Sequence, residues 1–182
     1  MGKFLLYFLA IYAVYANKSF FIAPTAPNID LSETDGENLH LGPKMVKPLV
    51  VSFVIDQCGY SDRALKIMNR VRSRFPYESL DVVGVYMNPS DNNQLINFKQ
   101  QKGAQFPLAN GQPNIESHIK LINSFEIGYL GRTIYVVNKS GKIYSVDADK
   151  DGADVILRNL LKTIKKRTGL KDQPGVPEPT AH

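Results

Sequence analysis

Two long apolar runs constrain the fold more than any other feature of the sequence. Residues 49–55 (LVVSFVI) and 80–87 (LDVVGVYM) are almost continuously apolar and rich in β-branched side chains. Such runs are typical of strands with both faces covered. Between them, residues 60–75 place apolar side chains on one face of a helix that Pro76 ends: Ala64, Leu65, Met68, Val71 and Phe75. The sequence therefore predicts a strand–helix–strand unit with two parallel strands in a buried sheet.

The remaining segments extend this unit into an α/β domain. Short strands are expected at 28–31 and 39–41, around the turn signal of residues 33–36. Later segments predict helices at 91–102, 115–125 and 153–167, and a hairpin of strands 133–137 and 142–146. The expected order is β-β-β-α-β-α-α-β-β-α, which predicts a central mixed sheet with helices on both faces. We expect 49–55, 80–86, 133–137 and 142–146 in one sheet, with helices 60–75 and 153–167 packed on it.

The two ends of the chain differ in composition from the domain of residues 28–168. Residues 1–16 combine Lys3, an apolar run at 4–13 and small residues before position 17, which is typical of a secretory signal peptide. An uncleaved membrane anchor is the alternative. Residues 17–27 form a polar leader, and residues 169–182 a Pro-rich tail that we expect to be disordered. The protein is therefore expected to be exported, to the periplasm or the extracellular space.

The charge pattern gives little support to a nucleic-acid partner. The chain has 22 basic and 17 acidic residues, a net charge of +5, and the excess lies mostly in residues 162–167. That run lacks aromatic side chains and ends a predicted helix, where cations complement the helix dipole. A membrane partner is expected only if the N-terminal segment is uncleaved.

No cofactor or metal site is expected from the sequence. The three histidines are scattered, without the spacing of metal ligands. Residues 147–152 (DADKDG) are similar to the first half of a calcium-binding loop, but Arg158 stands where its closing acid would fall. Capping of the last helix by these aspartates is the favoured interpretation, and calcium binding stays an open question.

The single cysteine, Cys58, lies where the strand of residues 49–55 gives way to the helix of residues 60–75. A helix N-terminus favours a thiolate and lowers the pKa of the thiol. One cysteine cannot form a disulfide within the chain, so this thiol is inert, paired with another molecule, or reactive. The sequence leaves a relic thiol and a reactive thiol about equally supported.

The order of segments resembles the thioredoxin fold, and more specifically the extracytoplasmic redoxins of the TlpA/ResA-like branch. The matching pieces lie within residues 24–165 and follow one another with the family's spacing: 26–31 (APNIDL), 35–36 (DG), 39–41 (LHL), 47–53 (KPLVVSF), 80–85 (LDVVGV), 106–108 (FPL), 125–128 (FEIG) and 140–143 (SGKI). The resemblance implies a three-layer α/β/α sandwich with a central mixed sheet and an N-terminal β extension. It also implies thiol–disulfide chemistry at Cys58.

Three active-site residues of that family have a different residue at the corresponding position of this chain. In the family's W-C-x-x-C site, Trp corresponds to Gln57 and the second cysteine to Ser61; Gly59 and Tyr60 lie between. Arg132 stands where the family has a cis-proline, immediately before Thr133. The resemblance places Arg132 close to the sulfur, where a guanidinium would lower the pKa of Cys58 further. Dithiol chemistry within one chain is excluded, so whether the protein is an enzyme stays open.

Two functions are consistent with these replacements. The first is mixed-disulfide chemistry through Cys58 with a protein or a low-molecular-weight thiol or disulfide. The second is a catalytically inactive module that holds a protein partner in the groove around residues 57–61 and 129–133. Two related classes fit less well. Monothiol glutaredoxins share the C-G-[aromatic]-S pattern but carry a Thr-Val-Pro segment, and peroxiredoxins have Pro and Thr where this chain has Val51 and Ile55.

Overall fold

The two apolar runs form neighbouring parallel strands at the centre of the sheet. In the computed structural model, which describes residues 23–89 and 91–173, β3 (Leu49–Val54) pairs with β4 (Asp81–Tyr86) in parallel along its whole length. Helix α2 (Gly59–Arg72) connects them. The predicted strand–helix–strand unit is therefore confirmed.

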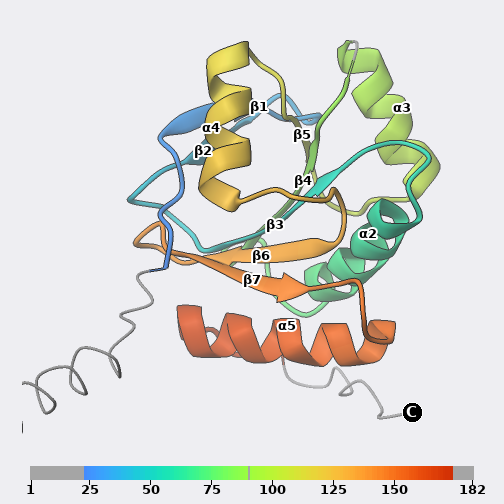
Figure 1. Cartoon of the computed structure of the whole chain (residues 1–182). Coiled ribbons are helices and arrows are strands. Elements are labelled where there is room, and N and C mark those ends of the chain that lie inside the picture. The colour runs from blue at the N-terminus through green and yellow to red at the C-terminus, as the bar shows by residue number, and fades with distance from the viewer. Residues whose placement is uncertain (1–22, 90, 174–182) are drawn as a thin grey trace, which may run out of the picture.

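The sheet has five strands in the order β5-β4-β3-β6-β7 (Figure 1). Strand β6 (Thr133–Val137) is antiparallel to both β3 and β7 (Ile143–Asp147). The four predicted strands thus share one mixed sheet, as expected. Strand β5 (Leu108–Asn110) was not predicted, because three residues after Pro107 are too short to show an alternating pattern; its pairing with β4 defines it.

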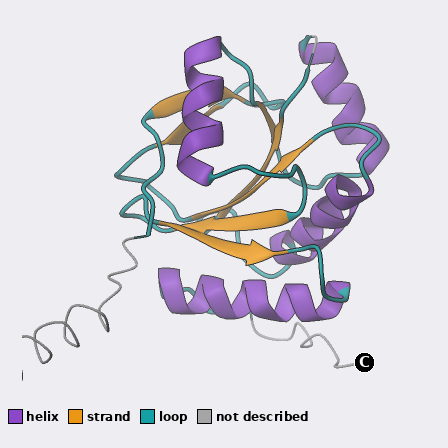
Figure 2. Ribbon diagram, in the orientation of Figure 1, coloured by secondary structure: helices purple, strands orange, loops and turns teal. Residues whose placement is uncertain are grey.

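Helices cover both faces of this sheet, which confirms the three-layer α/β/α arrangement (Figure 2). One face packs against α2, α3 (Asn92–Lys102) and α5 (Ala153–Thr168). The other packs against α4 (Ile115–Phe125) and the separate hairpin of β1 (Ile29–Ser32) and β2 (Asn38–Leu41). Successive residues of β3 alternate between the two cores, which explains why the whole strand is buried. The hairpin is the predicted N-terminal β extension.

Segments assigned by sequence to the leader and the tail also contact the domain. In the leader, Ala26 N–H donates to Gly141 O, and Ile143 N–H donates to Pro24 O. In the tail, Asp172 forms an ion pair with Lys165, and Gln173 N–H donates to the carbonyl of Arg74. The predicted signal peptide (1–16), residues 17–22 of the leader and residues 174–182 of the tail lie outside the described residues.

The described residues contain no membrane-crossing helix and no metal cluster. None of their helices is both long and apolar enough to span a bilayer. Nowhere among these residues do three or more His, Cys, Asp or Glu side chains gather in a way that could hold a metal ion.

Glu33, in the turn between β1 and β2, makes stability depend on pH. Burial, reinforced by the nearby carboxylates of Asp35, Asp81 and Glu37, raises its pKa to about 7. The folded state therefore binds this proton more tightly than the unfolded state, so Glu33 contributes stability at low pH that is lost as pH rises through about 7. We expect Glu33→Gln to raise the melting temperature at pH 8 more than at pH 5. Thermal unfolding of both proteins at the two values checks this, and equal shifts at both would contradict it.

Candidate active site around Cys58

The chain turns sharply between the end of β3 and the start of α2, and Cys58 is the last residue of that turn. Cys58 occupies the N-cap position with extended backbone angles (φ −119°, ψ 112°), and its side chain is partly exposed. Gln57 just before it adopts a left-handed conformation (φ 53°), which is uncommon for a residue other than glycine. This turn presents the sulfur to the first backbone N–H groups of the helix.

Hydrogen-bond donors converge on the sulfur and determine its acidity. Burial is the largest single influence and raises the pKa of Cys58. Three hydrogen bonds lower it: one from the Ser61 hydroxyl, and one each from the backbone N–H groups of Ser61 and Tyr60. Asp62 opposes them slightly, yet the net effect is a pKa below the ordinary value of a cysteine. The thiolate is therefore favoured by donors that belong to the helix N-terminus itself.

Ser61, which the sequence resemblance aligns with the second cysteine of a W-C-x-x-C site, is fully buried. Its hydroxyl oxygen accepts a hydrogen bond from Ile55 N–H at 3.1 Å, which leaves its own proton to donate to the sulfur of Cys58. The serine makes a polar contact with the sulfur, but it carries no sulfur of its own that could attack a mixed disulfide.

Lys102 at the end of α3 reaches the acidic residues that flank the sulfur. Its ammonium lies 2.8 Å from Asp62 and 3.8 Å from Asp56, and only a fifth of its side chain is exposed. The hydrogen bond to Asp62 raises the pKa of Lys102, so the lysine stays charged. We therefore infer that Lys102 reduces the tendency of Asp62 to raise the pKa of Cys58.

The loop between α4 and β6 closes over the N-terminus of α2. Gly131 N–H donates to Phe53 O at 2.7 Å, which fixes the loop to the end of β3. Gly131 has a positive φ of 74°, and a Cβ there would lie 2.7 Å from the Cα of Ser61. This close approach places the carbonyl of Leu130 3.9 Å from the sulfur of Cys58, within reach of the thiol proton.

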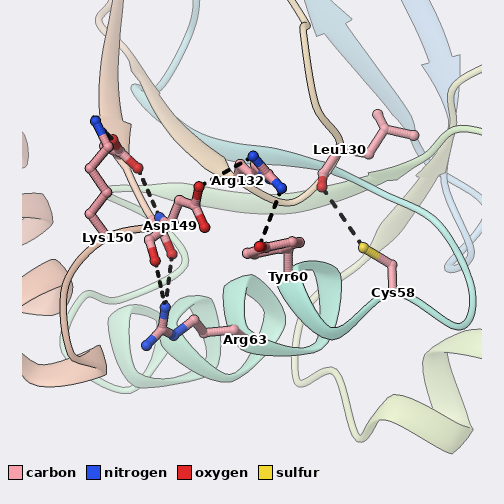
Figure 3. Close-up of polar contacts among 9 residues, drawn as sticks. Cys58, Tyr60, Arg63, Leu130, Arg132, Asp149 and Lys150 are labelled. Carbon is pink, nitrogen blue, oxygen red and sulfur yellow. Dashed lines mark hydrogen bonds and ion pairs between the residues drawn. The ribbon is translucent and has the colours of Figure 1, made fainter.

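Arg132 lies beside this loop in a network that includes Tyr60 and Asp149 (Figure 3). Its guanidinium stacks on the rings of Tyr60 and Tyr129, at 4.4 and 4.5 Å from their centroids. It also donates to the hydroxyl of Tyr60 at 3.2 Å and forms an ion pair with Asp149 at 3.3 Å. Arg63 of α2 in turn donates to the backbone carbonyl of Asp149. The network joins the start of α2 to the loop after β7.

This placement changes the expected electrostatic role of Arg132. The sequence predicted a guanidinium acting on the sulfur, whereas the influences on the pKa of Cys58 come from burial, Ser61, Tyr60 and Asp62. The ion pair with Asp149 offsets the charge of Arg132 at a distance. We infer that Arg132 acts on the site through Tyr60, by fixing its ring.

Replacement of Arg132 tests this role. We expect Arg132→Ala to leave the pH midpoint of Cys58 alkylation nearly unchanged and to lower the free energy of unfolding by about 1 kcal/mol, from the partly exposed ion pair and ring contacts. Arg132→Lys, which retains the charge without the planar guanidinium, serves as the control. A midpoint raised by about half a pH unit or more in Arg132→Ala alone would show that the guanidinium acts on the sulfur directly.

The structure brings together most of the residues singled out from the sequence. The first turn of α2 brings together Cys58, Tyr60 and Ser61. Arg132 donates a hydrogen bond to the hydroxyl of Tyr60. Behind the site, the carbonyl of Thr133 accepts a hydrogen bond from Ser52. The catalytic role of Cys58 and Arg132 stays a prediction. Sequence reasoning missed three contributors: Lys102, Leu130 and Asp149. Leu130 acts through its backbone, which carries no sequence signal, and the other two are brought to the site only by the fold.

The family of the chain is indicated by comparison with known proteins. Residues 22–146 match the model of the AhpC/TSA family. No curated protein matches the chain in sequence.

Solved structures of similar fold come from several kinds of redox protein. A candidate protein disulfide isomerase of Bacteroides thetaiotaomicron has a TM-score of 0.64 at 15% identity, over 82% of this chain and 91% of that one. BsSco, of the Sco family of cytochrome c oxidase assembly proteins, has a TM-score of 0.61 at 13% identity, over 82% and 96%. A cysteine-to-serine mutant of Xylella fastidiosa PrxQ has a TM-score of 0.58 at 18% identity, over 76% and 94%. At these identities the likeness shows a thioredoxin-like fold.

Proposed function

The chain belongs to the AhpC/TSA family of thioredoxin-fold redoxins, and we propose that it acts through a single thiol, Cys58, by forming mixed disulfides. One observation carries this proposal: the hydrogen bonds that Ser61 and Tyr60 direct at the sulfur lower its pKa despite burial. The order of motifs favours the TlpA/ResA-like branch within the family.

The proposed reaction is one thiol–disulfide exchange. The Cys58 thiolate attacks one sulfur of a disulfide R–S–S–R′, the S–S bond breaks, and the leaving R′S⁻ takes a proton from solvent. The product carries a Cys58–S–S–R bond. Because Ser61 has no sulfur, the adduct persists until an outside thiolate attacks it, which releases Cys58 and forms a new disulfide with R. The partner is thus a protein or a low-molecular-weight thiol or disulfide.

We propose that this exchange takes place outside the cytoplasm. The basis is the signal-like composition of residues 1–16. Extracytoplasmic compartments supply the disulfides that the reaction consumes, whereas the cytosol keeps most thiols reduced.

Reaction with glutathione disulfide tests the proposal on the full chain. We expect the folded protein at pH 7 to gain one glutathionyl group, observed by intact mass, and to lose it on addition of dithiothreitol. The expected rate exceeds that of the same chain in denaturant by about tenfold, because the donors to the sulfur exist only in the folded state.

Two controls accompany this experiment. The variant Cys58→Ser must give no adduct. In a parallel reaction of the wild type, hydrogen peroxide replaces glutathione disulfide. No adduct on the folded wild type, or a rate no higher than in denaturant, would contradict the proposal and favour a catalytically inactive binding module. Turnover of peroxide much faster than exchange with the disulfide would instead assign a peroxidase.

A further inference from the structure

Two exposed tyrosines belong to the two segments that contact the sulfur of Cys58. Tyr60, whose backbone N–H donates to the sulfur, is 37% exposed, and Tyr129 is 71% exposed. Tyr129 directly precedes Leu130, whose carbonyl lies 3.9 Å from the sulfur. We propose that this aromatic pair, Tyr60 and Tyr129, selects the partner of Cys58, namely a protein disulfide whose reacting cysteine is flanked by apolar or aromatic side chains. This selection rests on the exchange reaction proposed above and defines its substrate class.

Arg132 holds the two rings in fixed positions. Its guanidinium stacks on both, at 4.4 Å from the ring centroid of Tyr60 and 4.5 Å from that of Tyr129. The guanidinium is itself held by the ion pair with Asp149 at 3.3 Å and by the hydrogen bond to the Tyr60 hydroxyl at 3.2 Å (Figure 3). Exposed rings that are fixed before binding lose little conformational freedom when a partner packs on them. Arg132 is thus a positioning residue for this surface.

The cations described at this site, Arg132 and Lys102, are already paired with acids of the same chain. Arg132 is paired with Asp149, and Lys102 is paired with Asp62 and, at a longer distance, with Asp56. A charged substrate such as glutathione, which carries two carboxylates, would have to compete with those acids for the cations. An apolar or aromatic side chain needs no such competition and packs directly on the exposed rings. The charge pattern therefore favours an uncharged flank beside the reacting cysteine.

The surface next to the sulfur is open enough to admit a polypeptide. Cys58 is partly exposed, and Gln57 and Gly59 on either side of it are exposed. A Cβ at Gly59 would meet no heavy atom within 4 Å, and neither would one at Gly128, just before Tyr129. A substrate chain can therefore approach the sulfur without displacing protein atoms and can place its flanking side chains on the rings. A small disulfide without such side chains would leave the rings unused.

Exchange of the full chain with three peptides tests this selection. Each is a capped tripeptide whose central cysteine forms a mixed disulfide with 2-thiopyridine, and the peptides differ only in the residue on both sides of the cysteine: phenylalanine, glycine or glutamate. The Cys58 thiolate attacks the peptide sulfur, the S–S bond breaks, and the leaving pyridine thiolate takes a proton from solvent to give a thione that is followed by absorbance. Each rate is divided by the rate of the same peptide with N-acetylcysteine. We expect the phenylalanine peptide to react about fivefold faster than the glycine peptide, and the glutamate peptide no faster than the glycine peptide.

Variants assign this preference to the aromatic pair. Tyr129→Ala and Tyr60→Ala, the second of which keeps the backbone N–H, should each reduce the preference to about twofold or less. Arg132→Ala should lower it as well without moving the pH midpoint of alkylation, because the rings lose their support while the donors to the sulfur remain. Tyr77→Ala is the matched control and should retain the full preference. Tyr77 is 56% exposed and has Arg72 stacked on its ring at 3.9 Å, but it lies beyond the opposite end of α2.

Three results would overturn this selection while leaving the exchange reaction in place. Equal corrected rates for the phenylalanine and glycine peptides would show that the rings do not contact the partner. A preference retained in both tyrosine variants would place the apolar contact elsewhere. Fastest reaction with the glutamate peptide would assign the site to an anionic partner. Thione release no faster than in Cys58→Ser would, by contrast, contradict the exchange reaction and the selection together. Circular dichroism checks that each variant folds, and the wild-type comparison depends on no variant.

Discussion

Replacing Ser61 by cysteine is expected to convert a persistent mixed disulfide into a transient one. The Ser61 hydroxyl is hydrogen-bonded to the sulfur of Cys58, so a sulfur in its place lies beside the bond that it must attack. Attack on the Cys58–S–S–R bond then forms a disulfide within the chain, between positions 58 and 61, and releases R–S⁻. We expect the half-life of the glutathionyl adduct to fall by at least about a hundredfold, because the attacking thiol acts at a high effective concentration. Intact mass spectrometry over time measures this.

Two comparisons make the result specific to the new sulfur. Ser61→Ala removes the hydroxyl without adding a thiol, so its adduct should persist as in the wild type. The new side chain of Ser61→Cys also accepts the Ile55 N–H hydrogen bond less well, which is expected to cost about 1 kcal/mol of stability. If the adduct of Ser61→Cys lasts as long as that of Ser61→Ala, position 61 does not face the sulfur in the way described.

Replacing Gly131 by alanine is expected to disrupt both stability and the site. The residue has a positive φ, and its new methyl group would meet the backbone of Tyr60 and Ser61, which cannot move without displacing the start of α2. We expect the free energy of unfolding to fall by about 3 kcal/mol, combining left-handed strain with a steric clash. Denaturant unfolding measures this loss of stability. The rate of Cys58 alkylation should also change, because the displaced loop moves the carbonyl of Leu130 away from the sulfur.

Gly128 provides the matched control in the same loop. It has no positive φ, and a Cβ there would have no heavy atom within 4 Å. Gly128→Ala should therefore change the free energy of unfolding by less than about 0.5 kcal/mol. A Gly131→Ala variant as stable as Gly128→Ala would mean that the loop does not approach α2 so closely.

The predicted parts of the fold are those in which the local residue pattern is compatible with only one secondary structure and one pattern of burial. The apolar run of residues 49–55 must be buried on both faces, and the amphipathic segment that follows must cover one of them. Strand β5 could not be predicted, because its three residues become a strand only through pairing with β4. The contacts of residues 170–173 depend on Arg74 and Lys165 in the same way, so composition alone assigned them to a disordered tail.

At the site, too, the features that depend on neighbouring residues in the sequence were predicted, whereas those that depend on contacts between distant segments were not. The position of Cys58 at a helix N-terminus follows from the change of pattern around it, and so does the direction of its pKa shift. The cause of that shift was only partly predicted. Arg132 was expected to face the sulfur, but Asp149, from the loop after β7, holds its guanidinium beside Tyr60. Such pairings across the fold carry no signal in a single sequence.

The pH dependence of Cys58 alkylation on the folded full chain tests the central claim most directly, namely that donors at the N-terminus of α2 make this thiol reactive. We expect the midpoint of the rate against pH to lie below the ~8.5 of a free cysteine. It should rise in Ser61→Ala, because that variant loses the hydroxyl donor but keeps the two backbone donors. Cys58→Ser gives the blank. A wild-type midpoint at or above the free value, or one that Ser61→Ala leaves unchanged, would contradict the account.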